Sequence, residues 1–135
     1  MIGKIVIVVD FDGTVVTHDY PEIGNDIGAV PVLKKLVDAG HQLVLFTMRG
    51  NNNGANDRNY LVEAVKWFNQ NDIPLFGINT NPTQKNWTNS PKAYGQMIID
   101  DAALGCPLKF DYKLSNRPFV DWIKVEKLLK LNDLL

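Results

Sequence analysis

The feature that most constrains this chain is Ile5–Val9, a run of five β-branched residues that leads directly into Asp10. Because the run is apolar at every position, it fits a strand buried on both faces, as the central strands of parallel sheets are. Asp12 follows two residues later. In open α/β sheets, ligands bind beyond the carboxyl ends of the strands. The first strand therefore brings two carboxylates to the edge where such folds bind ligands.

Beyond this strand, helical and strand patterns alternate along the chain. The predicted helices lie between Pro31 and Gly40, from a cap at Asn56 or Asp57 up to Asn71, and over Asp121–Leu131. The predicted further strands are Leu43–Phe46, Leu75–Ile78 and Met97–Ile99, with an edge strand at Asp111–Leu114. This alternation favours one Rossmann-like α/β domain over residues 1–135. We expect a three-layer sandwich, in which helices cover both faces of a mostly parallel sheet.

Charge and cysteine content exclude several partners and compartments. The 135 residues carry a net charge of −1, too little to recruit long nucleic acid or an anionic membrane surface. Cys106 is the sole cysteine, so no internal disulfide can form, and no signal peptide is visible. The apolar run near the N-terminus is too short to span a bilayer. We therefore expect a cytoplasmic protein without a membrane partner.

Polar residues follow three of the predicted strands. Asp10 comes after the first strand, Thr47 after the second, and the pair Asp100–Asp101 after the fourth, with Lys92 a little upstream of that strand. Parallel strands present their carboxyl ends at one edge of a sheet, so these side chains are expected to meet in one crevice. Close carboxylates repel one another, and a bound cation is one way to keep them ionised.

Phosphoryl transfer is the chemistry that needs such a set. It requires an in-line nucleophile, a proton donor for the leaving oxygen, and positive charge around the equatorial oxygens. Mg²⁺ takes oxygen ligands and would convert the repulsion between carboxylates and phosphate into attraction. A lysine adds a point charge, while a threonine hydroxyl and the backbone N–H groups of the Gly13 turn can hold the remaining oxygens.

Four segments in this order resemble the signatures of the haloacid dehalogenase superfamily. DFDGT after the β-branched strand resembles the first, LVLFT the second, SPKAY the third and IIDD the fourth. The four segments span residues 5 to 101, and the rest of the chain is matched only loosely. The resemblance implies a haloacid dehalogenase-like fold and a Mg²⁺-dependent phosphatase, which hydrolyses phosphoric monoesters.

The resemblance also implies a role for each matching residue. Asp10 would be the nucleophile, which forms an aspartyl-phosphate, and a metal ligand. Asp12 would be the general acid and then the general base, and its main-chain carbonyl would bind the metal. Thr47 and Lys92 would hold the phosphoryl oxygens, and the pair Asp100–Asp101 would bind Mg²⁺, the second residue through water. An Asp two residues after the nucleophile implies a phosphate ester or anhydride as substrate.

The intervals between the signatures leave no room for a cap domain. Between Asp12 and Thr47 lie 34 residues, and between Thr47 and Lys92 lie 44, which the predicted elements fill. By resemblance, a capless enzyme has an open crevice and acts on bulky or macromolecular phosphates, or it borrows a neighbouring subunit of a homo-oligomer as its lid. The expected partner is a small phosphorylated substrate, with nucleotides and sugar phosphates both open. The rim of the crevice would be formed by residues 17–28, the loop after residue 50 and residues 80–91.

Several alternatives stay open at this level. Arg49 can bind an anionic part of the substrate, or it can hold a loop to a neighbouring carboxylate. His18 is expected to be a solvated loop residue rather than part of the pocket. A catalytically weak phosphate-binding relative remains an alternative to the phosphatase. A receiver-type signalling module uses similar residues, but its acceptor Asp lies on a middle strand, whereas DFDGT follows the first.

Overall fold

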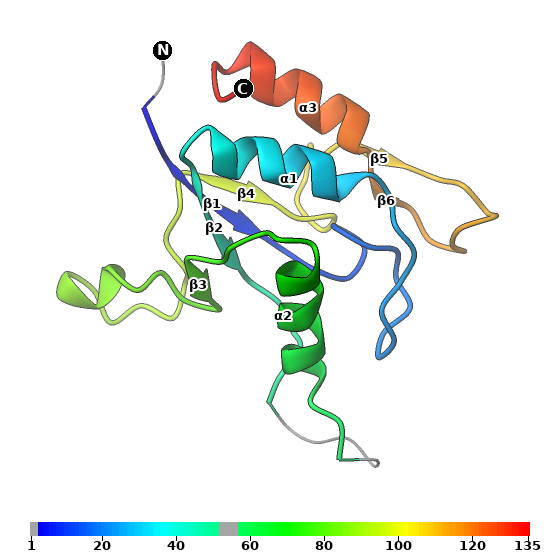
Figure 1. Cartoon of the computed structure of the whole chain (residues 1–135), viewed down its shortest axis with the longest axis horizontal. Helices are drawn as coiled ribbons and strands as arrows, with labels where there is room; N and C mark the ends of the chain where they lie inside the picture. Colours follow the sequence, from blue (N-terminus) through cyan, green and yellow to red (C-terminus); the bar gives the residue numbers. More distant parts are fainter. Residues whose placement is uncertain (1–2, 52–56) are drawn as a thin grey trace.

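The structure is a computed structural model that describes residues 3–51 and 57–135. Its main sheet has four parallel strands in the order β3-β2-β1-β4 (Figure 1). The strands are β1 (Val6–Val9), β2 (Gln42–Leu45), β3 (Gly77–Ile78) and β4 (Met97–Ile99). The helices are α1 (Ala29–Asp38), α2 (Tyr60–Gln70) and α3 (Trp122–Leu131), with a short 3₁₀ helix, η1 (Gln84–Asn86).

The predicted parallel sheet and its central strand are confirmed. β1 lies between β2 and β4, with Val8 opposite Val44 on one side and Ile98 on the other. The carboxyl ends of β1, β2 and β4 therefore lie at the same edge. The helix α1 agrees with its prediction, and α3 is capped by Asp121, whose side chain accepts from the N–H of Lys124.

The predicted cap of the second helix is wrong where it can be checked. The cap of α2 is Asn59, whose side chain accepts from Val62 N at 3.0 Å, and Asp57 lies two residues before it. The other predicted cap, Asn56, lies outside the described residues. Asparagine and aspartate cap helices equally well, so the sequence alone does not decide between neighbouring positions.

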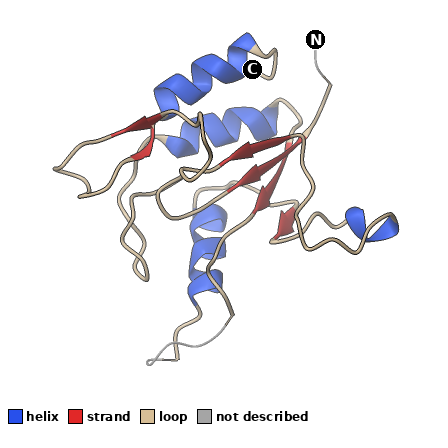
Figure 2. Cartoon of the chain, turned by 180° about the vertical axis from the view of Figure 1, so that it is seen from behind, coloured by secondary structure: helices blue, strands red, loops and turns tan. Residues whose placement is uncertain are grey.

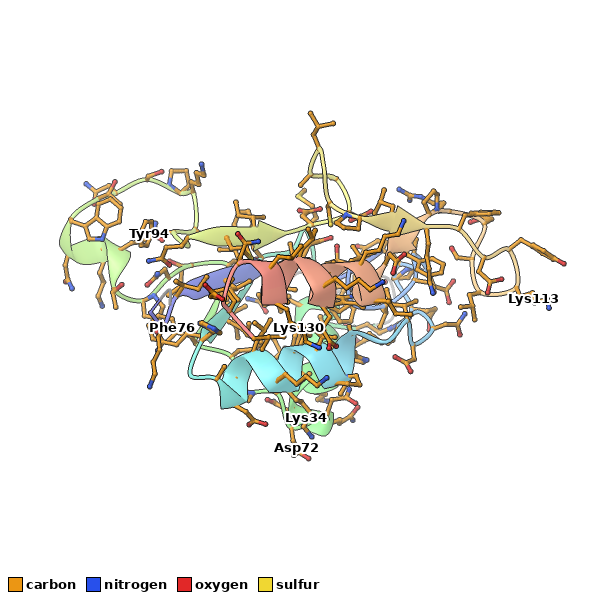
Figure 3. The ribbon with its side chains drawn as sticks, turned by 90° about the horizontal axis from the view of Figure 1, so that it is seen from above. Lys34, Asp72, Phe76, Tyr94, Lys113 and Lys130 are labelled. Carbon is orange, nitrogen blue, oxygen red and sulfur yellow. The ribbon has the colours of Figure 1, made fainter. Side chains whose placement is uncertain are left out.

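The α-helices α1, α2 and α3 gather on one side of the sheet, so the prediction that helices cover both faces is wrong for the α-helices of the described chain. Ile7, Val9, Leu43 and Leu45 share one core with the buried residues of α1, α2 and α3. Seen from above, Lys34 and Asp72 mark this helical side, and Tyr94 lies on the other (Figure 3). The regular structure thus forms two layers, not three.

The other face of the sheet is covered by the segment 79–95, which contains η1. Val8 and Val44 point to this face and pack against Ala93. Buried Gln84 organises the segment, since its Oε1 accepts from Tyr94 N at 2.8 Å and its Nε2 donates to Lys92 O at 2.9 Å. The cover is partial, because Ile98 remains 47% exposed. The sequence predicts a loop over residues 80–91, and between β3 and β4 the structure has a loop that contains only the short helix η1 and is built around the amide of Gln84.

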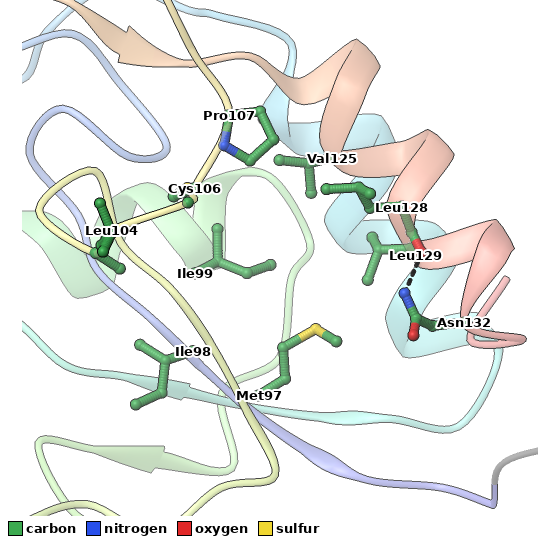
Figure 4. Close-up of a pocket in the computed structure, with 12 residues that line it drawn as sticks. Met97, Ile98, Ile99, Leu104, Cys106, Pro107, Val125, Leu128, Leu129 and Asn132 are labelled. Carbon is green, nitrogen blue, oxygen red and sulfur yellow. Dashed lines mark hydrogen bonds between the residues drawn. The ribbon is translucent and has the colours of Figure 1, made fainter.

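The predicted edge strand Asp111–Leu114 is wrong. Those residues form turns within a separate antiparallel pair, β5 (Leu108–Lys109) with β6 (Phe119–Val120), which stands apart from the main sheet (Figure 2). The outer side of β4 borders an apolar hollow of about 270 Å³, which α3 closes on its far side (Figure 4). β4 is therefore an edge strand of the described sheet.

The first interval between signatures holds no extra domain. Residues 12–47 are described throughout and contain a looped segment, α1 and β2. The described residues between Thr47 and Lys92 form α2, β3 and η1. Across the described chain, we find no helix with the length and hydropathy needed to cross a membrane.

Candidate functional site

A cleft opens at the carboxyl edge of the sheet, where β1, β2 and β4 end. It measures about 560 Å³, which is within the usual range for small-molecule sites. Six residues singled out in the sequence line it: Asp10, Asp12, Thr47, Arg49, Asp100 and Asp101. The expectation that the three strand ends meet in one crevice is therefore correct.

Three of the carboxylates can share one cation. One oxygen from each of Asp10, Asp100 and Asp101 lies within 4.8 Å of the other two. β1 supplies the first residue and β4 the pair, so the register between these neighbouring strands brings them together. An all-oxygen donor set suits hard cations such as Mg²⁺, Mn²⁺ or Ca²⁺. The chemistry of the donors therefore fits a metal site, and the side chain of Asp12 is not part of this group.

Thr14 links the members of this acidic group. Its Oγ1 lies 2.8 Å from Asp10 Oδ2 and 3.2 Å from Asp101 Oδ1, and it accepts from Asp101 N at 3.0 Å. The main chain of Thr14 is held as well, because buried Trp122 Nε1 donates to its carbonyl oxygen at 2.7 Å. The C-terminal helix α3 thus helps to fix the turn that follows β1.

Burial sets the protonation of Asp10. It raises the pKa of Asp10 from 3.8 to about 7, an effect that the charge of Asp100 reinforces and the hydrogen bond from Thr14 opposes. Burial acts on Asp101 too, but hydrogen bonds from His18, Asp10 and Thr14 outweigh it and lower the pKa of Asp101. A bound cation would favour the ionised form of all three carboxylates.

Asp10→Asn is expected to stabilise the metal-free protein at pH 8. The unfolded chain ionises Asp10 above pH 3.8, whereas the folded protein keeps it protonated up to about 7, so wild-type stability falls across this window. The amide cannot ionise and avoids this loss. Tm values should therefore show Asp10→Asn above wild type at pH 8, with the gap closing towards pH 4. Equal Tm values at pH 8 would contradict the raised pKa.

Arg49 binds Asp12 in a bidentate ion pair. Its Nε donates to Asp12 Oδ2 at 2.9 Å and its Nη2 to Oδ1 at 2.8 Å. The Arg49 side chain is fully buried, and its guanidinium lies over the rings of Phe11 and Tyr20. Such forked pairs are among the stronger and more directional hydrogen-bonded contacts in proteins. Asp12 therefore has a fixed orientation at the floor of the cleft.

The remaining N–H groups of Arg49 are also used. Nη1 donates to Pro21 O at 3.1 Å and Tyr60 O at 3.2 Å, and Nη2 donates to Glu22 O at 2.9 Å. A guanidinium has five N–H donors, so none remains for a substrate. Of the two alternatives, the structure supports the one in which Arg49 holds a loop and a carboxylate, and the prediction that it binds substrate is wrong.

Thr47 and the Gly13 N–H are the next two predicted phosphate contacts, and they differ in their availability to a ligand. Thr47 lines the cleft, and its Oγ1 accepts from Arg49 N at 3.1 Å, so among the described residues its hydroxyl hydrogen has no acceptor and can donate to a ligand. Gly13 has a φ of 82°, and a Cβ there would collide with the His18 ring. The Gly13 N–H donates to Val16 O at 2.8 Å, so the prediction that it binds substrate is wrong.

Lys92 does not line this cleft. It is exposed and borders a separate hollow on the other face of the sheet, together with Trp87, Tyr94 and Ile98. Its position follows from the folded segment 79–95, whose network around Gln84 holds the Lys92 carbonyl. The sequence places this lysine near β4 but does not reveal which way the preceding segment runs.

Three cleft residues with ionisable side chains were not expected to line the cleft from the sequence. His18 was predicted to be solvated, but its Nε2 lies 2.8 Å from Asp101 Oδ2 and the residue lines the cleft. Tyr20 and Arg117 also line it. No motif marks either of these, and Arg117 falls in a segment, 102–118, that the sequence patterns do not assign.

Comparison with known proteins supports the fold. No protein-family model and no curated protein matches the chain. A solved structure described as that of a "conserved protein coded by locus from Bacteroides thetaiotaomicron" is similar, with a TM-score of 0.74 and 28% sequence identity. The match covers 96% of this chain and 93% of that one. The α/β architecture with its mostly parallel sheet is thus shared over nearly the whole length of both chains.

Proposed function

We propose that this protein is a Mg²⁺-dependent phosphatase of the haloacid dehalogenase type, which acts on small phosphoric monoesters. The observation that carries the proposal is the meeting of Asp10 with Asp100 and Asp101 at the carboxyl edge of the sheet. Mg²⁺ held by these three carboxylates would supply positive charge for the phosphoryl oxygens. Thr47 lies in the same cleft with a free hydroxyl hydrogen to donate.

In this proposal Asp10 attacks the phosphorus atom. Thr14 occupies Asp10 Oδ2, so Oδ1 is the attacking oxygen, and an aspartyl-phosphate forms as the ester oxygen departs. Asp12 gives a proton to the leaving oxygen and later takes one from the water that hydrolyses the aspartyl-phosphate. Arg49 uses two of the roughly four lone-pair positions of the Asp12 carboxylate, which leaves the others for substrate or water.

Hydrolysis of an aryl phosphate tests the proposal directly. Purified protein with Mg²⁺ should release phosphate, and EDTA in excess should abolish the release, because the acidic site then lacks the positive charge that attracts the phosphate dianion. Added Mg²⁺ should restore it. A panel that includes nucleotides and sugar phosphates would then rank substrates. Equal rates with and without EDTA would refute a role for the metal.

A phosphate-binding protein without turnover is the second candidate. The observation in its favour is the bidentate Arg49–Asp12 pair, which ties the group assigned to proton transfer. Such a protein would bind orthophosphate in the presence of Mg²⁺ but release none from any ester in the panel. Calorimetry and a phosphate-release assay on the same preparation distinguish the two candidates.

A further inference from the structure

The cleft contains more negative than positive charge. Asp10, Asp12, Asp100 and Asp101 line it, while its cationic or ionisable bases among the described residues are His18, Arg49 and Arg117. A transferring phosphoryl group carries charge on its equatorial oxygens, which side-chain cations commonly bind in addition to a metal ion. One of the three bases would therefore have to meet the phosphate.

Two of the three are already engaged. Arg49 uses all five N–H groups within the protein and is fully buried. His18 contacts the Asp101 carboxylate at 2.8 Å. Lys92, which resemblance would assign to the phosphoryl oxygens, borders a different hollow. Arg117 is exposed, and among the described residues it forms no ion pair.

The backbone around Arg117 is hydrogen-bonded to the turn at residues 11–16 that follows Asp10, which we call the nucleophile turn. Two residues further on, β6 begins at buried Phe119, and Val120 N donates to Gly13 O at 3.1 Å. On the N-terminal side of Arg117, Asn25 Nδ2 donates to Leu114 O at 2.9 Å. This bond joins the hairpin formed by β5, β6 and the residues between them to the loop that follows the nucleophile turn. The hairpin therefore holds the base of a long side chain at a defined position beside the cleft.

We propose that Arg117 binds the phosphoryl oxygens of the substrate in this cleft, in place of Lys92. The inference rests on the proposed phosphatase function and names a binding residue for it. A guanidinium matches phosphate with paired N–H donors, and a free side chain on an anchored backbone can close on the ligand. Among the described residues of the cleft lining, Arg117 is thus the base that remains available to the phosphate, since Arg49 and His18 are engaged by carboxylates.

Three single variants test this assignment. Arg117→Gln should raise KM for an aryl phosphate, and Ki for orthophosphate as a competitive inhibitor, by about tenfold or more. Lys113→Gln removes one charge from the same hairpin, and Lys113 lies at its far end, outside the cleft lining (Figure 3). It should leave both constants near wild type. Lys92→Gln is the competing assignment and should have the smaller effect. Thermal unfolding should show all three folded, since these side chains are exposed.

The outcomes separate this inference from the function on which it rests. If wild type hydrolyses phosphate esters and Arg117→Gln leaves KM and Ki unchanged, Arg117 is not the binding residue and the phosphatase stands. A large rise for Lys92→Gln alone would return the role to Lys92. If no ester is hydrolysed, calorimetric titration with orthophosphate and Mg²⁺ still decides, because Arg117→Gln should bind about tenfold more weakly. Absence of binding and of turnover in wild type would overturn both.

Discussion

Asp10→Asn should lower metal-dependent phosphate release on the order of 10⁴-fold, the scale of losses seen when a catalytic nucleophile is removed. The amide oxygen is a poor nucleophile and cannot form the aspartyl-phosphate. Its size and its contact with Thr14 are retained, so the fold should survive. Steady-state phosphate release from an aryl phosphate at saturating Mg²⁺ measures the effect.

Asp72→Asn is the matched control for this change. Asp72 is exposed, lies just after α2, and has a φ of 56°, a conformation that asparagine adopts readily. It should retain wild-type activity. Metal-dependent hydrolysis that persisted in Asp10→Asn at more than a few per cent of wild type would remove Asp10 from the role of nucleophile.

Arg49→Met should destabilise the protein by about 3–5 kcal/mol, the cost typical of removing one partner of a buried ion pair. The change leaves the Asp12 carboxylate without its two donors and frees the carbonyl groups of Pro21, Glu22 and Tyr60. Methionine keeps much of the apolar volume, so the loss reports mainly on charge and hydrogen bonds. Urea-induced unfolding measures it.

Arg58→Met is the comparison for this second change. Arg58 also binds two carboxylates, Glu22 and Glu63, but at the surface, where solvent screens the pairs. The midpoint of unfolding should move far less than for Arg49→Met. Similar small shifts for both variants would show that the pair between Arg49 and Asp12 has little effect on folding.

The sequence predicts the strands best where side-chain chemistry leaves one solution. The β-branched run before Asp10 can only be a buried strand, and Met97–Ile99 has the same bounds in the structure as in the prediction. Side-chain chemistry within single segments does not predict whether helices cover one face of the sheet or both. This coverage depends on segment 79–95, which folds around the four hydrogen bonds of buried Gln84 and not around an apolar periodicity.

The residues of the candidate site also fall into two groups, those that the sequence can place and those that it cannot. Residues at strand ends, such as Asp10, Thr47 and Asp100, could be placed from the parallel register alone. His18 and Arg117 could not, because their positions follow from contacts between loops: the His18 ring packs on Gly13, and the hairpin that carries Arg117 hydrogen-bonds to the same turn. No local pattern encodes such contacts.

The complete burial of Arg49 depends on tertiary contacts that the sequence does not reveal. Arginine is rarely buried in full, and here it is tolerated because three separate segments supply its acceptors. These are the turn that contains Asp12, residues 21–22 and Tyr60 at the start of α2. A prediction from local patterns treats each segment alone, so it offers a carboxylate partner for Arg49 as one of two alternatives but does not reveal the carbonyl groups that complete its burial.

The ion pair between Arg49 and Asp12 also limits what the presence of Asp12 in a related chain says about catalysis. In a chain that no longer needs proton transfer, substitution of Asp12 would still lower the free energy of unfolding. The reason is that the buried Arg49 guanidinium would then have no carboxylate partner. Selection for a stable protein is therefore enough to retain Asp12, and the pair would have to be replaced together. In proteins of this fold, the presence of Asp12 is therefore weak evidence for catalysis. Among the described residues Asp10 has no cationic partner, so its presence is the better indicator of the proposed function.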